Sequence, residues 1–197
     1  MLKRCFDIAA SAVGLLLLSP LFLFLAIWIK LDSHGPVFYR QVRVGRGNRD
    51  FRLFKFRSMY VDSDRKGLLT VGGHDSRVTR AGYFIRKYKL DELPQLINVL
   101  VGDMSFVGPR PEVRRYVDLY DSEQLHVLDV RPGITDRASI KYSNENDLLA
   151  QAEDPEEYYI KVIMPDKLRI NLDYAARHSL WSDICIIFST FVKIGKK

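Results

Sequence analysis

The feature that most constrains the fold is a long apolar run near the N-terminus. It covers residues 5–29, and Lys3, Arg4 and Lys30 flank it. A helix needs about 20 mainly apolar residues to cross the hydrocarbon core of a bilayer, so this run is long enough. A secretory signal peptide is disfavoured, because no small-residue cleavage site follows the run. We therefore expect a membrane-embedded N-terminal helix.

A Ser-Pro pair near the middle of the run argues against a straight span. Pro20 follows Ser19 there, and an interior proline breaks a backbone hydrogen bond and bends a helix. The basic residues at both ends give no orientation by the positive-inside rule. We predict a helix broken at Ser19-Pro20 that enters and leaves the membrane on the cytoplasmic face. A kinked span is the alternative, since membrane helices tolerate proline.

Composition narrows the class of protein. The length of 197 residues suits one domain with an appendage. We expect residues 1–31 to form the re-entrant helix and residues 32–197 to form a cytoplasmic domain at the membrane interface. The net charge of +6 favours an anionic partner such as a membrane surface, a phosphate or nucleic acid. The two distant cysteines show no zinc-type spacing with histidine, which fits a reducing compartment.

A second informative segment runs from Lys89 to Pro111 and reads KLDELPQLINVLVGDMSFVGPRP. Its apolar side chains recur at the spacing of one helix face, at Leu93, Leu96, Ile97, Leu100 and Val101. Pro94 is tolerated only in the first turn of a helix, so we predict a helix that begins near Asp91 and stops at Gly102. At the cap of such a helix, free N–H groups and the helix dipole favour the ionised form of Asp91.

Taken alone, the pair Asp91-Glu92 is most often no more than a helix start. A functional role for the pair is favoured by Arg110, which lies between Pro109 and Pro111 in the same segment. The prolines fix the backbone on both sides, so the guanidinium extends from a stiff base. The pair is therefore a candidate for chemistry when it is considered with the rest of the chain.

Residues 37–44 and 51–58 are rich in strand-forming side chains and are separated by turn residues, so a β-hairpin is predicted. Arginines recur along it at every third position, namely Arg40, Arg43, Arg46, Arg49 and Arg52. This period matches neither face of a strand, so we expect most of them to be solvated beside acidic lipid headgroups. Lys55 and Arg57 are two residues apart in a strand and share a face, so they are candidates to hold a diphosphate together.

The remaining segments predict helices and loops. We expect a polar loop over residues 62–74, followed by a helix from Asp75 or Ser76 to about Lys87 that carries Arg86 toward Asp91-Glu92. The further predictions are an amphipathic helix over 112–129, a rigid turn at 131–135, a helix start at Asp154-Pro155, an apolar helical stripe that Pro165 ends, and an apolar helix over 183–194. This last helix belongs either to the core or to the bilayer interface. The predicted fold class is α+β, mostly helical.

Several motifs occur together in one order: the apolar run with Ser19-Pro20, Lys55-Phe56-Arg57-Ser58-Met59, Leu90-Asp91-Glu92-Leu93-Pro94-Gln95, Gly102-Asp103-Met104-Ser105-Phe106-Val107-Gly108-Pro109-Arg110-Pro111, and Arg131-Pro132-Gly133-Ile134-Thr135. In this combination the chain resembles the small monotopic phosphoglycosyl transferases of the bacterial sugar transferase family. The resemblance covers nearly the whole chain. The chain departs from it at residues 136–139, where many members read Gly-Trp-Ala-Gln and this sequence reads Asp-Arg-Ala-Ser. This departure leaves the identity of the sugar open.

The resemblance implies an activity and a location. Members move a sugar-1-phosphate from a UDP-sugar to polyprenyl (undecaprenyl) phosphate, with release of UMP, at the cytoplasmic face of the bacterial inner membrane. This is the first membrane step of glycoconjugate assembly. By resemblance, Asp91 is the nucleophile of a covalent aspartyl phosphosugar intermediate, Mg²⁺ bridges Asp91 and the diphosphate, and Ser19-Pro20 breaks the re-entrant helix. We expect Glu92 to support the magnesium or to deprotonate the acceptor. The expected substrate-binding residues are Lys55, Arg57, Arg86, Pro109, Arg110, Pro111 and Arg131.

Two other classes of protein are alternatives to the enzyme. A non-catalytic adaptor that binds the phospholipids of the inner membrane would not need Asp91 or Glu92. A nucleic-acid binder that uses the arginine-rich hairpin would show a steep dependence on salt. Neither explains the segment around Arg110 together with the apolar N-terminus, so we expect no nucleic-acid partner. The sequence carries no indication of the oligomeric state.

Overall fold

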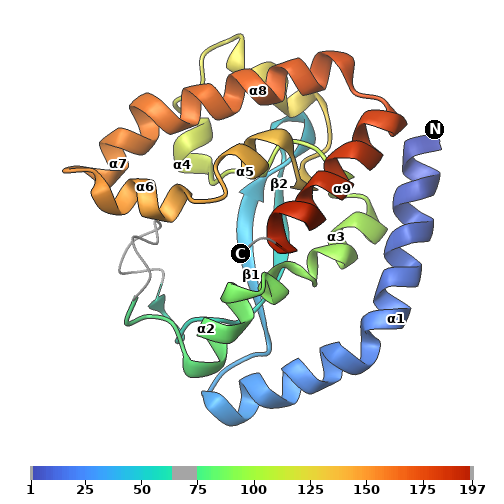
Figure 1. The fold of residues 1–197 in the computed structure, drawn as a ribbon, viewed down its shortest axis with the longest axis vertical. Helices are drawn as coiled ribbons and strands as arrows, with labels where there is room; N and C mark the ends of the chain where they lie inside the picture. Colours follow the sequence, from blue (N-terminus) through green and yellow to red (C-terminus); the bar gives the residue numbers. More distant parts are fainter. Residues whose placement is uncertain (1, 64–74, 196–197) are drawn as a thin grey trace.

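The computed structural model describes residues 2–63 and 75–195, so most of the predicted polar loop over 62–74 lies outside the described residues. Helix α1 (Leu2–Asp32) contains Pro20 and is continuous in its backbone assignment. Figure 1 shows that it runs down one side of the molecule and then bends to pass beneath it. The bend agrees with the missing N–H of Pro20 and with the hydroxyl of Ser19, which donates to the carbonyl of Leu16 at 2.7 Å.

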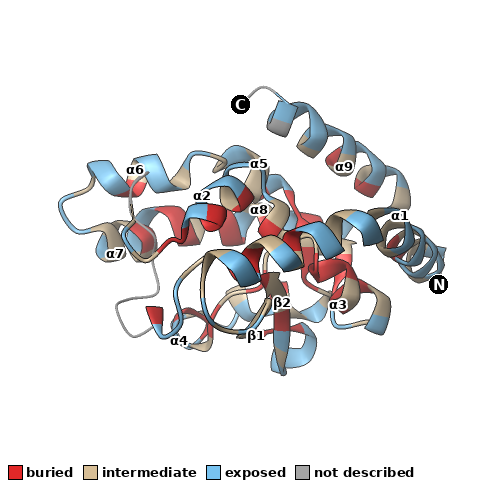
Figure 2. Cartoon of the chain, turned by 90° about the horizontal axis from the view of Figure 1, so that it is seen from below, coloured by how far each residue is buried: buried red, intermediate tan, exposed pale blue. Residues whose placement is uncertain are grey.

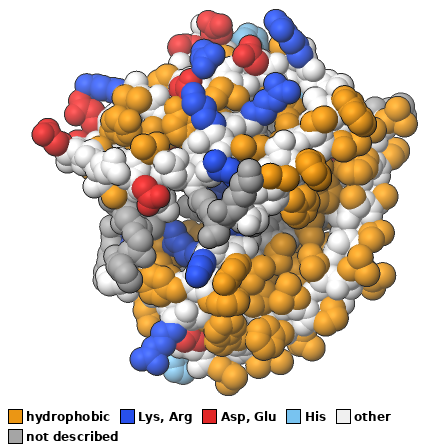
Figure 3. Space-filling model, in the orientation of Figure 1, with side chains coloured by type: hydrophobic (Ala, Val, Ile, Leu, Met, Phe, Trp, Pro, Cys, Tyr) orange, Lys and Arg blue, Asp and Glu red, His pale blue; other side chains and the backbone are white. Residues whose placement is uncertain are grey.

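Little of α1 is buried, and much of its exposed surface is apolar. Leu16 has 74% of its surface exposed, and only Asp7, Ser11, Leu25 and Ile29 are buried against the rest of the protein. Hydrophobic side chains gather along the right-hand and lower parts of the face in Figure 3, over this helix. Within the described ranges, α1 is the one helix long and apolar enough to cross a membrane by length and composition.

The predicted hairpin is confirmed. Strands β1 (Phe38–Val44) and β2 (Asp50–Phe56) pair antiparallel in a register that joins Val44 to Asp50 and Phe38 to Phe56. The connection contains a short 3₁₀ turn, η1 (Arg46–Asn48), in which Gly47 adopts φ 66°. Glycine reaches this left-handed conformation without the cost that a side chain imposes.

The segment predicted as a rigid turn at 131–135 instead supplies a strand. Strand β3 (Ser105–Val107) pairs parallel with β4 (Gly133–Thr135). The two backbones approach closely after β3, because an added Cβ at Gly108 would lie 2.2 Å from the carbonyl oxygen of Arg131. Strands this short form only because other elements cover both of them, which a local sequence pattern does not reveal.

The remaining helices surround the two small sheets (Figure 1). They are α2 (Arg80–Lys87), α3 (Gln95–Val101), α4 (Arg114–Val117), α5 (Arg137–Lys141), α6 (Glu145–Gln151), α7 (Pro155–Tyr158), α8 (Met164–Arg177) and α9 (Leu180–Gly195), with the 3₁₀ turns η3 (Leu90–Glu92) and η4 (Gln124–Asp129) and the π-helical turn η5 (Tyr159–Ile163). The fold is mostly helical with small sheets, as predicted.

Three predicted boundaries are wrong. Helix α2 begins after Thr79, whose hydroxyl accepts from the N–H of Gly82 at 3.0 Å, and not at Asp75 or Ser76. The segment 112–129 forms only α4 and η4, separated by a loop. Pro165 does not end its helix, because the π-helical turn η5 precedes it and the chain continues directly into α8. The helix start at Asp154 is confirmed, since its carboxylate caps α7 through Glu156 and Glu157.

Helix α9 has a buried face and an exposed face. Ile186 and Asp183 are buried against the protein, whereas Trp181, Phe188 and Phe191 are exposed. The colouring of Figure 2 shows the same division along α9, with exposed and buried turns on one helix. One face therefore belongs to the core, and the other presents aromatic side chains outward.

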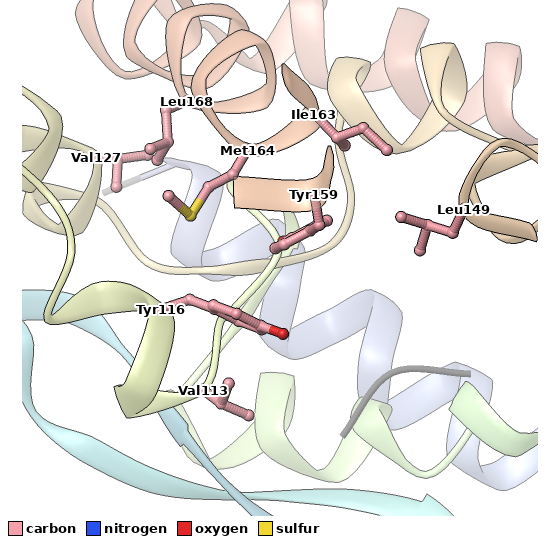
Figure 4. Packing of buried hydrophobic residues seen from close by; sticks show 8 residues of the cluster. All are labelled: Val113, Tyr116, Val127, Leu149, Tyr159, Ile163, Met164 and Leu168. Atoms are coloured by element: carbon pink, nitrogen blue, oxygen red, sulfur yellow. The ribbon is translucent and has the colours of Figure 1, made fainter. Parts of the chain in front are cut away.

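The buried side chains form separate clusters. One lies between α4, η4, α6, η5 and α8 and contains the residues in Figure 4: Val113, Tyr116, Val127, Leu149, Tyr159, Ile163, Met164 and Leu168. A second joins α1 to β2 and α2 through Leu25, Ile29, Phe56, Ala81 and Ile85. The candidate site described next is attached to both clusters.

Candidate active site

Asp91 and Glu92 lie in the 3₁₀ turn η3, between α2 and α3. Lys89 adopts a left-handed conformation (φ 57°) and turns the chain into η3. Leu90 and Leu93, on either side of the two acids, pack against the cluster that joins α1, β2 and α2. Both carboxylates are therefore held on a turn whose apolar flanks are anchored.

The predicted capping role of Asp91 is wrong. Helix α3 begins at Gln95, after Pro94, and no side chain caps η3. Asp91 is 9% exposed, and burial raises the pKa of its carboxyl, although the positive charge of Lys55 opposes the shift. No hydrogen bond to this carboxylate occurs among the described residues. The environment of Asp91 is thus a buried one rather than the positive end of a helix.

Glu92 has the opposite environment. Arg110 donates to both of its carboxylate oxygens, with Arg110 Nη1 at 3.3 Å from Oε2 and Nη2 paired with Oε1. The Nζ of Lys55 lies 3.5 Å from the same Oε1. Burial opposes ionisation, but the charges of Arg110 and Lys55 outweigh it and hold the pKa of Glu92 well below its usual range. Glu92 is therefore an anion fixed between two cations.

The buried face of α3 differs from the predicted one. Gln95, Leu96, Asn98 and Val99 are buried, whereas Val101 is exposed. Asn98 accounts for much of the difference, since its Nδ2 donates to the carbonyl of Arg52 at 2.9 Å and its Oδ1 accepts from the N–H of Phe54 at 2.9 Å. These bonds attach α3 to β2 close to Lys55. The predicted helix end at Gly102, in the left-handed region at φ 103°, is confirmed.

The segment around Arg110 is fixed through its backbone. The N–H of Gly133 donates to the carbonyl of Pro109 at 2.9 Å, and the N–H of Gly108 donates to the carbonyl of Thr135 at 3.1 Å. These bonds continue the pairing of β3 with β4 up to the arginine. The negative charges of Glu92 and Asp136 raise the pKa of Arg110, so it stays cationic. Asp136 is buried and caps α5 through Ser139; the sequence showed it only as part of the departure from the family pattern at residues 136–139.

Two of the predicted substrate-binding arginines bond to backbone carbonyls elsewhere. The guanidinium of Arg57 donates to the carbonyls of Ser33 at 2.7 Å and Ile29 at 3.2 Å, at the end of α1. Arg57 is thus bonded at the end of α1, whereas Lys55 pairs with Glu92, and a diphosphate held by both side chains stays a prediction. Arg131 donates through Nε to the carbonyl of Gly102 at 2.9 Å, at the end of α3. Arg86 lies on α2, and its charge acts on Asp91.

Arg43 is a site residue that the sequence pattern did not single out. It was grouped with the solvated arginines of the hairpin, yet its Nη1 donates to the carbonyl of Pro111 at 3.0 Å. Its carboxylate neighbour is Glu112, at 3.5 Å. The three-residue period contained the signal, because a period that matches neither face of a strand must turn some arginines toward the protein.

The two acids differ in how well they fit a magnesium donor set. Among the described residues no group of three metal-binding side chains occurs. Magnesium is bound in many enzymes by one or two carboxylates together with substrate phosphates and water, so a large protein cage is unnecessary. The carboxylate of Asp91 fits this donor set, since it is buried without a hydrogen-bond donor in the described part of the chain. Glu92 is occupied by Arg110 and Lys55.

Fold and site together define a class of protein: a helical domain with a long exposed apolar helix and a buried carboxylate next to a cation-bound one. Comparison with known families is specific. The family described as bacterial sugar transferase matches residues 1–197, and the chain belongs to this family.

Curated relatives carry names that agree with this family. The chain is 44% identical over 96% of its length to the UDP-N-acetylgalactosamine-undecaprenyl-phosphate N-acetylgalactosaminephosphotransferase of Aeromonas hydrophila, covering 42% of that protein. It is 40% identical over 99% of its length to the UDP-glucose:undecaprenyl-phosphate glucose-1-phosphate transferase of Xanthomonas campestris, covering 39% of it. An enzyme of the same name from Caulobacter vibrioides is 37% identical over 95% of the chain and 67% of its own length. The chain thus spans about two fifths of the first two relatives.

Proposed function

We propose that this protein is a phosphoglycosyl transferase that moves a sugar-1-phosphate from a UDP-sugar to undecaprenyl phosphate and releases UMP. The observation that carries the proposal is the contrast within Asp91-Glu92: one carboxylate is fixed between two cations, and its neighbour is buried without a donor among the described residues. Family membership and the names of the relatives support the same reaction.

The reaction proceeds in two displacements. An oxygen of Asp91 attacks the phosphorus that bears the sugar, an aspartyl–phosphorus bond forms, and the bond from this phosphorus to the oxygen of UMP breaks. A phosphate oxygen of undecaprenyl phosphate then attacks the same phosphorus and displaces the carboxylate of Asp91. The products are a sugar-diphospho-undecaprenol and the regenerated carboxylate.

Lys55 and Arg110 provide positive charge for the diphosphate. Both are paired with Glu92, and the charge of Asp91 acts on both as well, so the site holds two cations close to the two carboxylates. Fixed cations that face developing negative charge are worth more in a partly buried site than in water. Glu92 keeps both cations in place before the substrate arrives and adjusts their position once the diphosphate binds.

Magnesium belongs to the proposal as well. Asp91 would hold the ion together with phosphate oxygens of the substrate, and a bound Mg²⁺ would supply further neutralisation of the diphosphate. Every other part assigned here rests on the protein's own side chains.

The exposed apolar surface supports a proposed location at a membrane. An exposed stripe as long as that of α1 is rare in soluble monomers and fits lipid, and the exposed Trp181, Phe188 and Phe191 of α9 suit a bilayer interface. We assign α1 as a re-entrant helix, residues 32–197 as a monotopic catalytic domain, and the cytoplasmic face of the inner membrane as its site. The acceptor phosphate lies at the headgroups, where such a domain meets it.

The covalent route has a direct test. Purified protein is mixed with magnesium and a panel of UDP-sugars without lipid, quenched, digested and searched by mass spectrometry for sugar phosphate on the peptide that contains Asp91. UDP-N-acetylgalactosamine and UDP-glucose lead the panel, since they are the donors named for the relatives. The wild type should carry the adduct and Asp91→Asn should not. UMP release that strictly requires undecaprenyl phosphate would contradict the intermediate, and an inactive wild type would leave the adaptor class in its place.

A further inference from the structure

The residue after the Pro109-Arg110-Pro111 segment is held from several directions. The carboxylate of Glu112 accepts the hydroxyl of Tyr159 at 2.6 Å on Oε1, and its Oε2 lies 3.5 Å from Arg43. The carbonyl of Glu112 accepts the N–H of Val44 at 2.9 Å. Side chain and backbone of Glu112 are thus both bonded, and the partners come from β1 and from the distant turn η5.

Arg43 completes the arrangement on the hairpin side. Its Nη1 donates to the carbonyl of Pro111 at 3.0 Å, while Nε and Nη2 donate to Oε1 of Gln41 at 3.0 Å and 2.8 Å. Burial lowers the pKa of Arg43, and the charge of Glu112 partly restores it. Its donors are engaged within the protein, so Arg43 holds the backbone next to Arg110 rather than a substrate.

Tyr159 approaches from the opposite side, out of the apolar cluster of Figure 4. It is 2% exposed, its ring lies 5.0 Å from that of Tyr116, and the Nζ of Lys167 stands 5.3 Å from its centre. Tyr159 begins the π-helical turn η5. Such turns are uncommon and often occur at functional sites. A phenylalanine would fill this position in an apolar cluster equally well. Packing alone therefore does not explain why Tyr159 carries a hydroxyl that is buried and donates to Glu112.

We infer that Arg43, Glu112 and Tyr159 are positioning residues that set the place of the Arg110 guanidinium; the inference rests on the proposed function. The two bonded groups, the carbonyl of Pro111 and the whole of Glu112, follow Arg110 directly in the chain. The prolines on both sides of Arg110 stiffen the segment, so a shift at Glu112 reaches the arginine instead of being absorbed. The contact of Arg110 with Glu92, and with it the donor site, therefore depends on a hydroxyl from a different part of the fold.

The test compares two tyrosines. Tyr159→Phe removes the hydroxyl that donates to Glu112. The control Tyr142→Phe removes a hydroxyl beside the same apolar cluster that donates, at 2.7 Å, to Asp166 instead of Glu112. We expect kcat/KM for the UDP-sugar to fall ~10-fold in Tyr159→Phe, mainly through KM, and less than about twofold in the control. Thermal unfolding of both variants, measured in parallel, shows how much the loss of one hydrogen bond lowers the stability of the protein, apart from any effect on catalysis.

A double-mutant cycle separates positioning from a general effect on structure. In an Arg110→Lys background, Tyr159→Phe should change kcat/KM less than about twofold, because the group that it positions is gone. A full effect in that background, or equal kinetics in Tyr159→Phe and Tyr142→Phe, overturns the inference. If Tyr159→Phe folds poorly, Arg43→Lys takes its place in the same cycle. An inactive wild type would instead count against the proposed function itself.

Discussion

Among single residues, the adjacent acids Asp91 and Glu92 have surroundings that shift their pKa values in opposite directions. Burial raises the pKa of Asp91, whereas Arg110 and Lys55 lower that of Glu92 against the effect of its own burial. Neighbouring carboxyls whose pKa values are driven apart commonly divide the work of an active site. We assign attack to Asp91, which no cation pairs directly within the described structure, and alignment of the cations to Glu92.

This difference predicts a pH dependence. Asp91 attacks only when ionised, so kcat/KM for UMP release should fall as the pH drops through its raised pKa. The charge of Lys55 favours the ionised form, and Lys55→Met should therefore move the acid limb of the pH profile to higher pH. The measurement is kcat/KM against pH, with Arg49→Met as a control that removes an exposed cation from the hairpin. If the acid limb does not move in Lys55→Met, then the ionisation of Asp91 is not what produces this limb.

The second residue-scale prediction concerns Arg110. Its two terminal nitrogens reach both oxygens of Glu92, a geometry that a lysine ammonium does not reproduce. Arg110→Lys should lower turnover by about 100-fold although the charge is kept, similar to the loss of one fixed donor in other active sites. Arg114→Lys is the control, since Arg114 pairs with Asp50 on an exposed surface. Near-normal turnover in Arg110→Lys would leave this segment a structural turn.

At the scale of elements, the two short parallel strands carry the site. Strand β3 runs directly into the segment of Arg110, and β4 supplies the N–H that bonds the carbonyl of Pro109. The pairing depends on a glycine in each of the two segments, Gly108 just after β3 and Gly133 in β4, where the backbones nearly touch. A parallel pair of this length has little stability of its own, so this close approach matters to the whole region.

Gly133→Ala tests that dependence. The added Cβ would lie 2.1 Å from the backbone nitrogen of Gly108, so the strands must separate, and we expect a loss of about 3 kcal/mol in the free energy of unfolding. Gly195→Ala is the matched control, because its Cβ would meet no described atom within 4 Å. Thermal or denaturant unfolding in detergent measures both. Equal stability of the two variants would show that β3 and β4 tolerate wider spacing.

At the scale of the whole molecule, the N-terminal helix is bound to the catalytic region by polar contacts. Asp7 is buried in α1 and accepts from the hydroxyl of Ser105 at 3.1 Å and the N–H of Phe106 at 3.2 Å. Lys3 donates to the carbonyl of Val107 at 3.0 Å and pairs with Asp183 of α9. The start of α1 is therefore fixed to β3 and α9, and this attachment favours the proposed re-entrant helix over one that leaves on the far side of a bilayer.

This arrangement predicts the topology in cells. After Cys5 and Cys185 are replaced by serine, cysteines at the exposed positions of Leu2 and Leu31 should both resist a membrane-impermeant thiol reagent added from the periplasm. Pro20→Leu restores a backbone N–H in mid-helix and should favour a straighter α1 in which one position becomes reactive. Labelling of either position in the unmutated helix would mean that α1 spans the membrane.

Features that depend on neighbouring residues can be predicted from local sequence patterns. The apolar length of α1, the hairpin, the cap at Asp154 and the stop at Gly102 all follow from side chains within a few residues of one another. Side-chain chemistry and the resemblance also pointed to Asp91, Glu92, Lys55 and Arg110 before any packing was known. Each of these inferences uses only local backbone geometry or the identity of the residue.

Local sequence patterns do not reveal which charged side chains come into contact. Glu92 and Arg110 are 18 residues apart in the chain, and Tyr159 and Glu112 are 47 apart, so no periodicity brings them together. Arg43 and Arg57 have the same chemistry on one hairpin, yet one holds the carbonyl of Pro111 and the other the end of α1. The physical reason is that burial and long-range hydrogen bonds depend on how all elements pack, and packing overrides local preference where the two compete.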